Sequence, residues 1–172
     1  NPDNFMRLKK IVEQFKEFPL AIELRHNSWR KEWFLNWLRE NKLAFANIDQ
    51  PIFSHSLALT EIITAPSAYV RLHGRNKENW FKEEARTAER YDYFYELNEL
   101  EEWIERIKKI AEHAQELYVI ANNHFQGKGL ANTLMLKFLW TRKKQPAPKS
   151  LIEKYPVLRE FCEPIEAQRA LF

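Results

Sequence analysis

The stretch Ala68-Tyr69-Val70-Arg71-Leu72-His73 decides the fold, because it has the pattern of a buried strand and ends at Gly74. Three further stretches of this kind occur at residues 20–25, 43–49 and 117–122. Helical patterns lie around them at residues 2–18, 30–41, 97–114 and 130–140, and Asn27 or Ser28 could cap the second helix. Strands that alternate with helices form a parallel sheet covered by helices. The sequence therefore predicts an α/β fold, either an open doubly wound sheet or a TIM barrel.

The composition bounds the class of protein. Of the 172 residues, 45% are hydrophobic, which is enough for one sizeable core. Only three glycines are present, so neither a Walker loop nor a GxGxxG dinucleotide motif can be formed. Cys162 is the single cysteine, and the sequence contains neither an apolar run of about 18 residues nor a signal-like segment. We therefore expect a cytoplasmic protein with no membrane partner.

Polar and charged residues gather late in each predicted strand. In parallel sheets and barrels, ligands bind at the carboxyl ends of the strands, where the connecting loops converge. A buried strand would not normally carry unpaired Glu and Arg at such positions. The residues concerned are Glu23, Arg25 and His26 on the first strand, Asn47 and Asp49 on the second, Arg71, His73 and Arg75 on the third, and Asn122, Asn123 and His124 on the fourth.

A structural role is the alternative for the same residues. Glu23, Arg25, Asp49 and Arg71 could form an ion-pair layer that fills the interior of a barrel. His26 and His73, each taken alone, are as well explained as hydrogen-bonded core imidazoles, and Asn122 and Asn123 as loop caps. The clustering at one level, rather than any single residue, favours a site.

Three strings at these positions resemble a known family. Ala21-Ile22-Glu23-Leu24-Arg25-His26-Asn27-Ser28-Trp29, Tyr69-Val70-Arg71-Leu72-His73-Gly74-Arg75 and Tyr118-Val119-Ile120-Ala121-Asn122-Asn123-His124 look like the E-x-R-H-x-S-W, Y-V-R-L-H-G-R and NNH signatures of the YecE-like proteins, also called the domain of unknown function 72 (DUF72) family. The resemblance spans roughly residues 2–140. It implies a TIM-barrel fold, and it brings no established activity with it.

The resemblance also implies that this chain supplies only half of a barrel. A TIM barrel has eight strands and typically about 250 residues, whereas four strands are visible here. We expect residues 1–149 to form the C-terminal half of the barrel domain, with a basic linker at 141–149, and residues 150–172 to form a helical tail. An open half leaves sheet edges unpaired. The remaining strands would come from an N-terminal half of the same protein or from a homodimer partner.

The leading functional hypothesis is hydrolysis or rearrangement of a small anionic molecule that carries a phosphate. We expect Glu23, His26, Asp49 and His73 to be catalytic and to transfer protons. We expect the substrate to be bound by Arg25, Asn47, Arg71, Arg75, Asn122, Asn123 and His124, with the arginines holding the anion. Glu, Asp and His at the mouth of a barrel could also hold a divalent metal, although no HExxH or CxxC spacing occurs.

A non-catalytic module that binds nucleic acid or a nucleotide is the second hypothesis. The basic residues Lys137, Arg142, Lys143, Lys144 and Lys149 would contact phosphates, and an exposed aromatic such as Trp80 would stack on bases. A solvated linker is the favoured explanation of the basic run. The net charge of +3 gives only weak support for a nucleic-acid or anionic-membrane partner.

Overall fold

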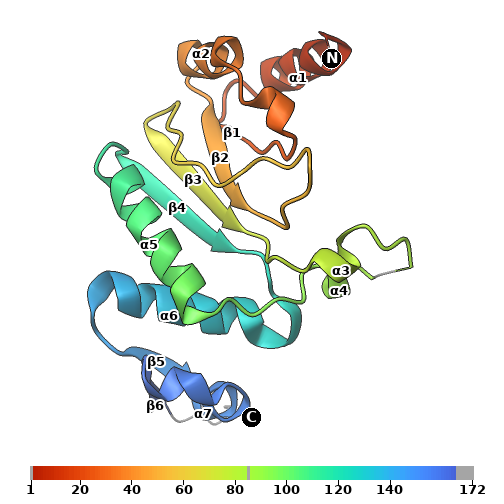
Figure 1. Cartoon of the computed structure of the whole chain (residues 1–172). Helices are drawn as coiled ribbons and strands as arrows, with labels where there is room; N and C mark the ends of the chain where they lie inside the picture. Colours follow the sequence, from red (N-terminus) through yellow and green to blue (C-terminus); the bar gives the residue numbers. More distant parts are fainter. Residues whose placement is uncertain (1, 85, 166–172) are drawn as a thin grey trace, which may run out of the picture.

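A computed structural model describes residues 2–84 and 86–165 of the chain. The strands β1 (Ala21–Ile22), β2 (Ala44–Asp49), β3 (Ser67–Leu72) and β4 (Glu116–Ala121) form a parallel sheet in the order β1-β2-β3-β4 (Figure 1). All three pairings are parallel. The predicted α/β class and parallel sheet are confirmed, with strand ends shifted by at most three residues.

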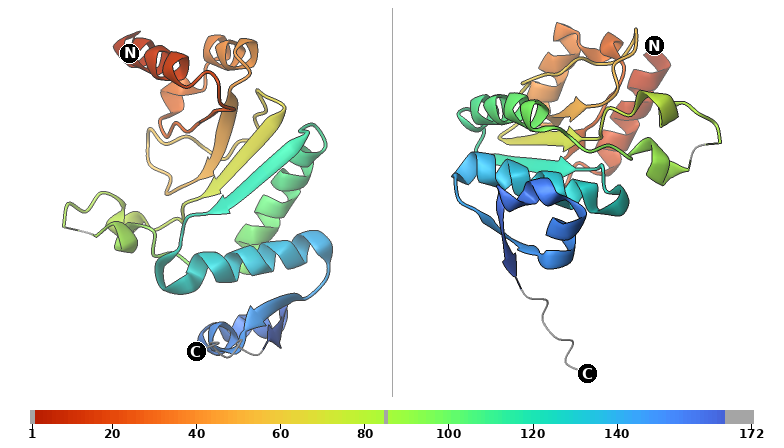
Figure 2. Two further views of the ribbon diagram at one scale, coloured as in Figure 1. Left: turned by 180° about the vertical axis from the view of Figure 1, so that it is seen from behind. Right: turned by 60° about the horizontal axis from the view of Figure 1, so that its bottom comes forward.

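Four longer helices accompany the sheet: α1 (Pro2–Gln14), α2 (Glu32–Glu40), α5 (Leu97–Ala111) and α6 (Lys128–Thr141). Helix α5 packs on β3 and β4, and α6 packs beside α5 and against β4, as Figure 2 shows. The prediction that Asn27 or Ser28 caps the second helix is wrong. Lys31 precedes α2, while residues Asn27–Trp29 form the 3-10 turn η1, whose first turn is capped by the His26 side chain.

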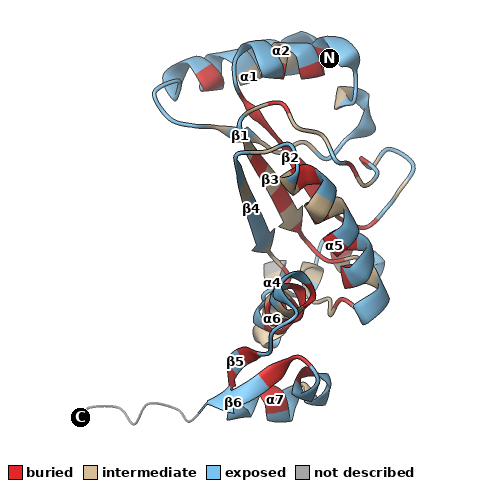
Figure 3. Cartoon of the chain, turned by 90° about the vertical axis from the view of Figure 1, so that its left-hand side faces the viewer, coloured by how far each residue is buried: buried red, intermediate tan, exposed pale blue. Residues whose placement is uncertain are grey.

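Two hydrophobic clusters hold the sheet. One packs α1 and α2 against β2 through side chains such as Phe34, Leu38 and Ile48. The other joins β3 to α5 and α6 through Leu72, Trp103 and Met135, among others. Strand β4 differs from β2 and β3, because much of it is open to solvent, as Figure 3 shows. Its consecutive residues Tyr118, Val119 and Ile120 are 50%, 36% and 37% exposed, so apolar side chains on both faces of this edge strand stay partly uncovered.

The C-terminal region is more ordered than the sequence indicated. Strand β5 (Gln145–Pro148) pairs in parallel with β6 (Cys162–Ile165), and α7 (Lys149–Lys154) and the 3-10 turn η3 (Pro156–Arg159) connect them. The predictions of a linker over 141–149 and a wholly helical tail are therefore wrong for these residues. Burial explains the difference, because Ala147 and Cys162 pack in the same cluster as α6. Residues 166–172 of the predicted tail lie outside the described residues.

The long connection after β3 carries the short helices α3 (Lys77–Trp80) and α4 (Thr87–Arg90). It starts at Gly74, whose backbone has φ +88°, a conformation that favours glycine. Trp80 is buried in this connection, so its predicted role as an exposed stacking residue is wrong. Within residues 2–84 and 86–165, no helix combines the length and the hydrophobicity needed to cross a membrane.

Candidate functional site

The strand register separates the predicted site residues into two sets. Ile48, Arg71 and Ile120 are aligned across β2, β3 and β4, and so are Asp49, Leu72 and Ala121. Because successive residues of a strand point to opposite faces, Arg71 and Asp49 lie on opposite sides of the sheet. Asp49 and Arg71, both predicted site residues at the same level of the sheet, therefore do not face a shared cavity. Asp49 shares its face with Leu72, toward the covering helices.

The first set meets at the carboxylate of Glu23, which follows β1. Arg71 donates from Nη1 to Glu23 Oε2 at 2.7 Å. Glu23 Oε1 lies 3.0 Å from His73 Nε2 and accepts a bond from Arg25 Nε at 3.1 Å. With Asn122, described next, these residues form what we call the Glu23 cluster. The structure thus brings together one acid, two arginines and one histidine from β1, β3 and their C-terminal extensions.

Asn122, which follows β4, completes the Glu23 cluster. Its Oδ1 accepts a bond from Arg71 Nη2 at 3.2 Å, and its Nδ2 lies 3.3 Å from His73 Nδ1. These contacts fit the tautomer in which His73 donates from Nε2 to Glu23 and accepts at Nδ1 from the Asn122 amide. The side chain of His73 is fully buried. The imidazole is therefore fixed in orientation and in proton position by its two neighbours.

The charges around Glu23 favour its ionised form. Burial alone would raise the pKa of Glu23, but the hydrogen bond from His73 and the charges of Arg71 and Arg25 outweigh it and lower that pKa to about 2. The Glu23 side chain is 19% exposed, whereas those of Arg71 and Arg25 are 32% and 42% exposed. The carboxylate is thus shielded, while both guanidinium groups reach solvent.

Aromatic rings from the connection after β3 enclose the Glu23 cluster. The ring of Tyr91 lies 5.8 Å from that of His73, and the ring of Trp80 lies 6.3 Å from it. The Arg25 guanidinium lies over Trp80 at 5.2 Å. Burial lowers the pKa of Arg25, but a hydrogen bond with Tyr91 and the charge of Glu23 more than offset this and raise it above its ordinary value. These rings restrict water around the charged groups and strengthen their interactions.

The second set, around Asp49, links the sheet to α5. Arg75 Nε donates to both oxygens of Asp49 at 2.9 and 3.0 Å, and the indole of Trp103 donates to Oδ2 at 2.6 Å. Arg75 also donates to Glu99 on α5 at 3.0 Å. Burial raises the pKa of Asp49, although the bonds from Arg75 and Trp103 act in the opposite direction. With Asp49 almost fully enclosed, this network has the geometry of an anchor between β2 and α5.

The side chains of three further predicted site residues form hydrogen bonds with the backbone. The Asn47 side chain donates to the carbonyl of Ile62 and accepts from its amide, which holds the connection between β2 and β3. Asn123 is buried and donates to the carbonyl of Tyr93. His26 lies at the rim of the site, where its Nδ1 accepts from the Ser28 amide at 3.1 Å. The contacts of Asn123 fit the loop-cap alternative raised from the sequence, and Asn47 holds a loop in a similar way.

His124 lies at the edge of the Glu23 cluster. Its side chain is exposed, and its ring stands 6.1 Å from that of Tyr91. Its Nδ1 lies 2.9 Å from the carbonyl oxygen of Asn122, which fixes the ring beside the cluster.

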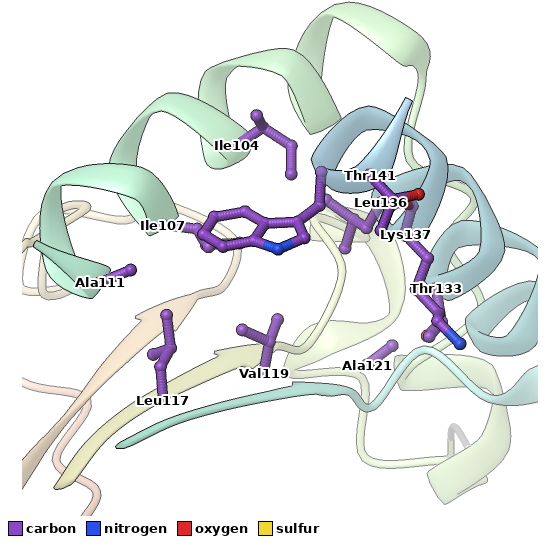
Figure 4. Close-up of a pocket in the computed structure, with 11 residues that line it drawn as sticks. Ile104, Ile107, Ala111, Leu117, Val119, Ala121, Thr133, Leu136, Lys137 and Thr141 are labelled. Carbon is purple, nitrogen blue, oxygen red and sulfur yellow. The ribbon is translucent and has the colours of Figure 1, made fainter. Parts of the chain in front are cut away.

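A groove beside Arg25 was not expected from the sequence. It has a volume of about 380 Å³, and we call it the Arg25 groove; its lining includes His26, Gln50, Phe53, His55, Trp80 and Phe81. The only signal for it in the sequence is the set of aromatic residues in the two long connections. A separate apolar pocket of about 430 Å³ lies between β4, α5 and α6 (Figure 4). Its lining, which includes Ile104, Ile107 and Val119, offers no acid or histidine for proton transfer.

The predicted divalent metal finds no ready set of ligands. Among the residues that the structure describes, no group of three or more His, Cys, Asp and Glu side chains could hold a metal ion. Glu23 and His73 meet, but Asp49 lies on the other face of the sheet, and His26 is engaged with the η1 turn. The acidic and histidine side chains therefore do not converge, because the sheet separates Asp49 from Glu23 and His73.

The basic residues of the nucleic-acid hypothesis lie apart from the Glu23 cluster. Helix α6 begins beside the end of β4 and runs away from it, and Arg142 and Lys143 follow its far end (Figure 1). Lys144 is engaged with the carbonyl of Arg159 at 2.9 Å. Lys137 lines the apolar pocket.

Comparison with known proteins gives consistent matches. UPF0759 protein YunF of Bacillus subtilis (strain 168) is 26% identical over 159 residues, which make up 87% of this chain and 56% of that protein. A solved structure of a DUF72 family protein from Thermotoga maritima MSB8 matches with a TM-score of 0.69 and 35% identity, covering 76% of this chain and 50% of the other. One from Enterococcus faecalis V583 matches with a TM-score of 0.74 and 30% identity, covering 84% and 55%.

The chain thus spans about half the length of the relatives it matches. A protein-family model described as "Protein of unknown function DUF72" matches residues 1–154. The resemblance seen in the three sequence motifs is confirmed by this match, and the chain belongs to the DUF72 family.

Proposed function

We propose that the Glu23 cluster is part of the active site of a hydrolase or related enzyme that acts on a small anionic, phosphate-bearing molecule. One observation carries the proposal: a buried histidine and a shielded carboxylate lie in contact, between two arginines that reach solvent. Buried pairs of acid and base beside exposed cationic donors are typical of sites that bind an anion and transfer a proton.

Arg25 and Arg71 bind the anion in this proposal. A guanidinium group has five N–H donors, and the contacts with Glu23 and Asn122 use only some of those of Arg71. The remaining donors can form charge-assisted bonds to phosphate oxygens. The two arginines outweigh the one carboxylate in charge, so the site attracts anions. Asn122 and His124 would contribute at the edge of the same site.

His73 and Glu23 transfer the proton. Glu23 holds the His73 ring through Nε2, and Asn122 holds it through Nδ1, so the ring is oriented before any ligand arrives. A fixed imidazole beside a carboxylate serves as a general acid or base. Both ring nitrogens of His73 are engaged, so the Asn122 amide has to release Nδ1 before that nitrogen can take a substrate proton. Asp49 is not needed for this step and acts as the anchor of β2 to α5.

We also propose that the parallel sheet is one half of a TIM barrel. Support comes from the unbroken parallel order of four strands, the site at their carboxyl ends, and the exposed face of β4. Further strands would pair with the free edge of β4, supplied by another part of a longer polypeptide or by a second copy of the chain. Light scattering of the purified chain tests the second source, because a strictly monomeric, cooperatively folded species contradicts it.

Binding of inorganic phosphate, measured by titration calorimetry in a non-phosphate buffer, tests the anion site. Arg71→Ala should weaken phosphate binding by about tenfold to a hundredfold, the worth of a charge-assisted bond, with only a modest loss of stability. The matched control is Arg106→Ala, which removes an arginine that is paired with Glu61 and Glu102 outside the cluster. Its phosphate affinity should equal that of the unaltered protein.

Turnover of phosphate esters tests the proton-transfer role. His73→Gln should lose turnover while phosphate still binds, because Arg25 and Arg71 stay in place. Equal phosphate affinity in Arg71→Ala and the unaltered protein would refute the site. Loss of folding in Arg71→Ala would instead favour the ion-pair layer that the sequence left open. Polyanion binding that falls steeply with salt, without turnover of small esters, would favour the nucleic-acid hypothesis.

A further inference from the structure

The Arg25 groove adjoins the Glu23 cluster, and the proposed function gives it no role. It lies between the connection that follows β2 and the start of the connection that follows β3. Its volume of about 380 Å³ is at the lower end of the range seen for small-molecule pockets. Arg25 is the residue that the groove and the cluster share.

The walls of the Arg25 groove are fixed by backbone hydrogen bonds. The Leu57 amide donates to the carbonyl of Arg25 at 2.8 Å, and the Asn27 amide donates to the carbonyl of His55 at 2.9 Å. The buried side chain of Gln50 donates to the same Arg25 carbonyl at 3.0 Å. The segment after β1 and the connection after β2 are therefore tied together before a ligand binds, and this fixed wall lowers the entropy lost on binding.

Most of the residues that line the Arg25 groove carry aromatic rings. Phe53 and Phe81 contact each other with ring centroids 4.8 Å apart, and the rings of His26 and His55 stack at 5.3 Å. Phe81 is 71% exposed, the highest value among the large hydrophobic side chains that the structure describes. The Phe81 ring therefore lies largely in water beside the groove. When a flat apolar group enters the groove, this ring gains contact area and loses exposed surface.

Arg25 couples the Arg25 groove to the anion. Its Nε is bonded to Glu23 in the cluster, and the face of its guanidinium lies over Trp80, which also lines the groove. An anionic group held by Arg25 and Arg71 would therefore place the rest of its molecule at the opening of the groove. A guanidinium plane and aromatic rings both stack favourably on a flat π system.

We propose that the Arg25 groove is the subsite for an aromatic ring carried by the anionic ligand, so that the substrate class is aryl-bearing phosphates and related aryl anions. This rests on the proposed function, because the anion itself is bound at Arg25 and Arg71. The groove selects for a planar ring rather than an aliphatic chain, since most of the residues that line it carry rings: Phe53, Phe81, Trp80, His26 and His55.

Calorimetric titration with three probes tests the subsite: inorganic phosphate, methyl phosphate and phenyl phosphate. Phenyl phosphate should bind at least about tenfold more tightly than methyl phosphate, which corresponds to about 1.4 kcal/mol. Phe81→Ala and Phe53→Ala should each remove most of this preference and leave the affinity for inorganic phosphate unchanged. Phe18→Ala is the matched control, because Phe18 is also strongly exposed but precedes β1, at the opposite end of the sheet.

The outcomes separate the two proposals. If inorganic phosphate and both esters fail to bind, the anion site is refuted, and the subsite with it. If phosphate binds but phenyl phosphate binds no more tightly than methyl phosphate, the subsite alone is overturned. The same conclusion follows if the preference for the phenyl ester persists in both Phe81→Ala and Phe53→Ala.

Discussion

Replacing Glu23 by glutamine tests the electrostatics at the centre of the site. The pKa of Glu23 is lowered from 4.5 to about 2 in the folded protein. A lowered carboxyl pKa stabilises the fold above the unfolded-state value, and this stabilisation is lost as the pH falls toward the folded-state value. The shift corresponds to about 3 kcal/mol in total, and about 2 kcal/mol of it is lost between pH 5.5 and pH 3.

Glu23→Gln keeps the size of the side chain and removes its titration. Urea unfolding, followed by circular dichroism, gives the free energy of unfolding of both proteins at each pH. The unaltered protein should be more stable than Glu23→Gln at pH 5.5. This difference in the free energy of unfolding should shrink by about 2 kcal/mol when the pH is lowered to 3. Taking the difference between the two proteins cancels the titration of other groups that the substitution leaves alone.

Glu13→Gln is the matched control for this experiment. Glu13 also pairs with a cation, Lys16, at 2.7 Å, but both side chains are well exposed. Exposed pairs contribute at most about 1 kcal/mol, so this variant should show little change with pH. The usual effect of a surface substitution is about 0.5 kcal/mol. If the difference in the free energy of unfolding between the unaltered protein and Glu23→Gln stays constant within that range from pH 5.5 to pH 3, the arrangement described for the Glu23 cluster is refuted.

Two further predictions concern the scaffold behind the site. Asp49→Ala leaves Arg75 and the Trp103 indole without their buried acceptor, and should lower the free energy of unfolding by about 3 to 5 kcal/mol. Asp49→Asn should cost less stability and keep phosphate affinity, and a loss of affinity in this folded variant would return Asp49 to the active-site residues expected from the sequence. Gly74→Ala should destabilise by about 1 to 3 kcal/mol, because φ is +88° and the added Cβ would lie 2.6 Å from Tyr93 Cβ. Thermal unfolding of Gly74→Ala checks this, and an unchanged midpoint would contradict the tight approach of Tyr93.

The sequence by itself determined the α/β class, the parallel strands and the carboxyl-end position of the polar residues. These features depend on local patterns in the sequence. The alternation of apolar and polar residues marks each strand, and the end of that alternation marks the end of the strand. The level at which Glu23, Arg71 and His73 meet was also foreseeable, because each lies late in a strand or just after it. That they meet across β2, which separates β1 from β3, was not. The motif resemblance identified the family from the same short stretches.

Only the tertiary structure decided which face each polar residue occupies. Asp49 and Arg71 are both late in their strands, but the register aligns Asp49 with Leu72, and a shift of one residue moves a side chain to the other face. Strand β5 was not predicted from the sequence for a related reason. Its residues Gln145–Pro148 have little strand propensity, and pairing with Cys162–Ile165 and burial of Ala147 outweigh that preference. Register and long-range pairing depend on contacts between distant residues, which no local pattern contains.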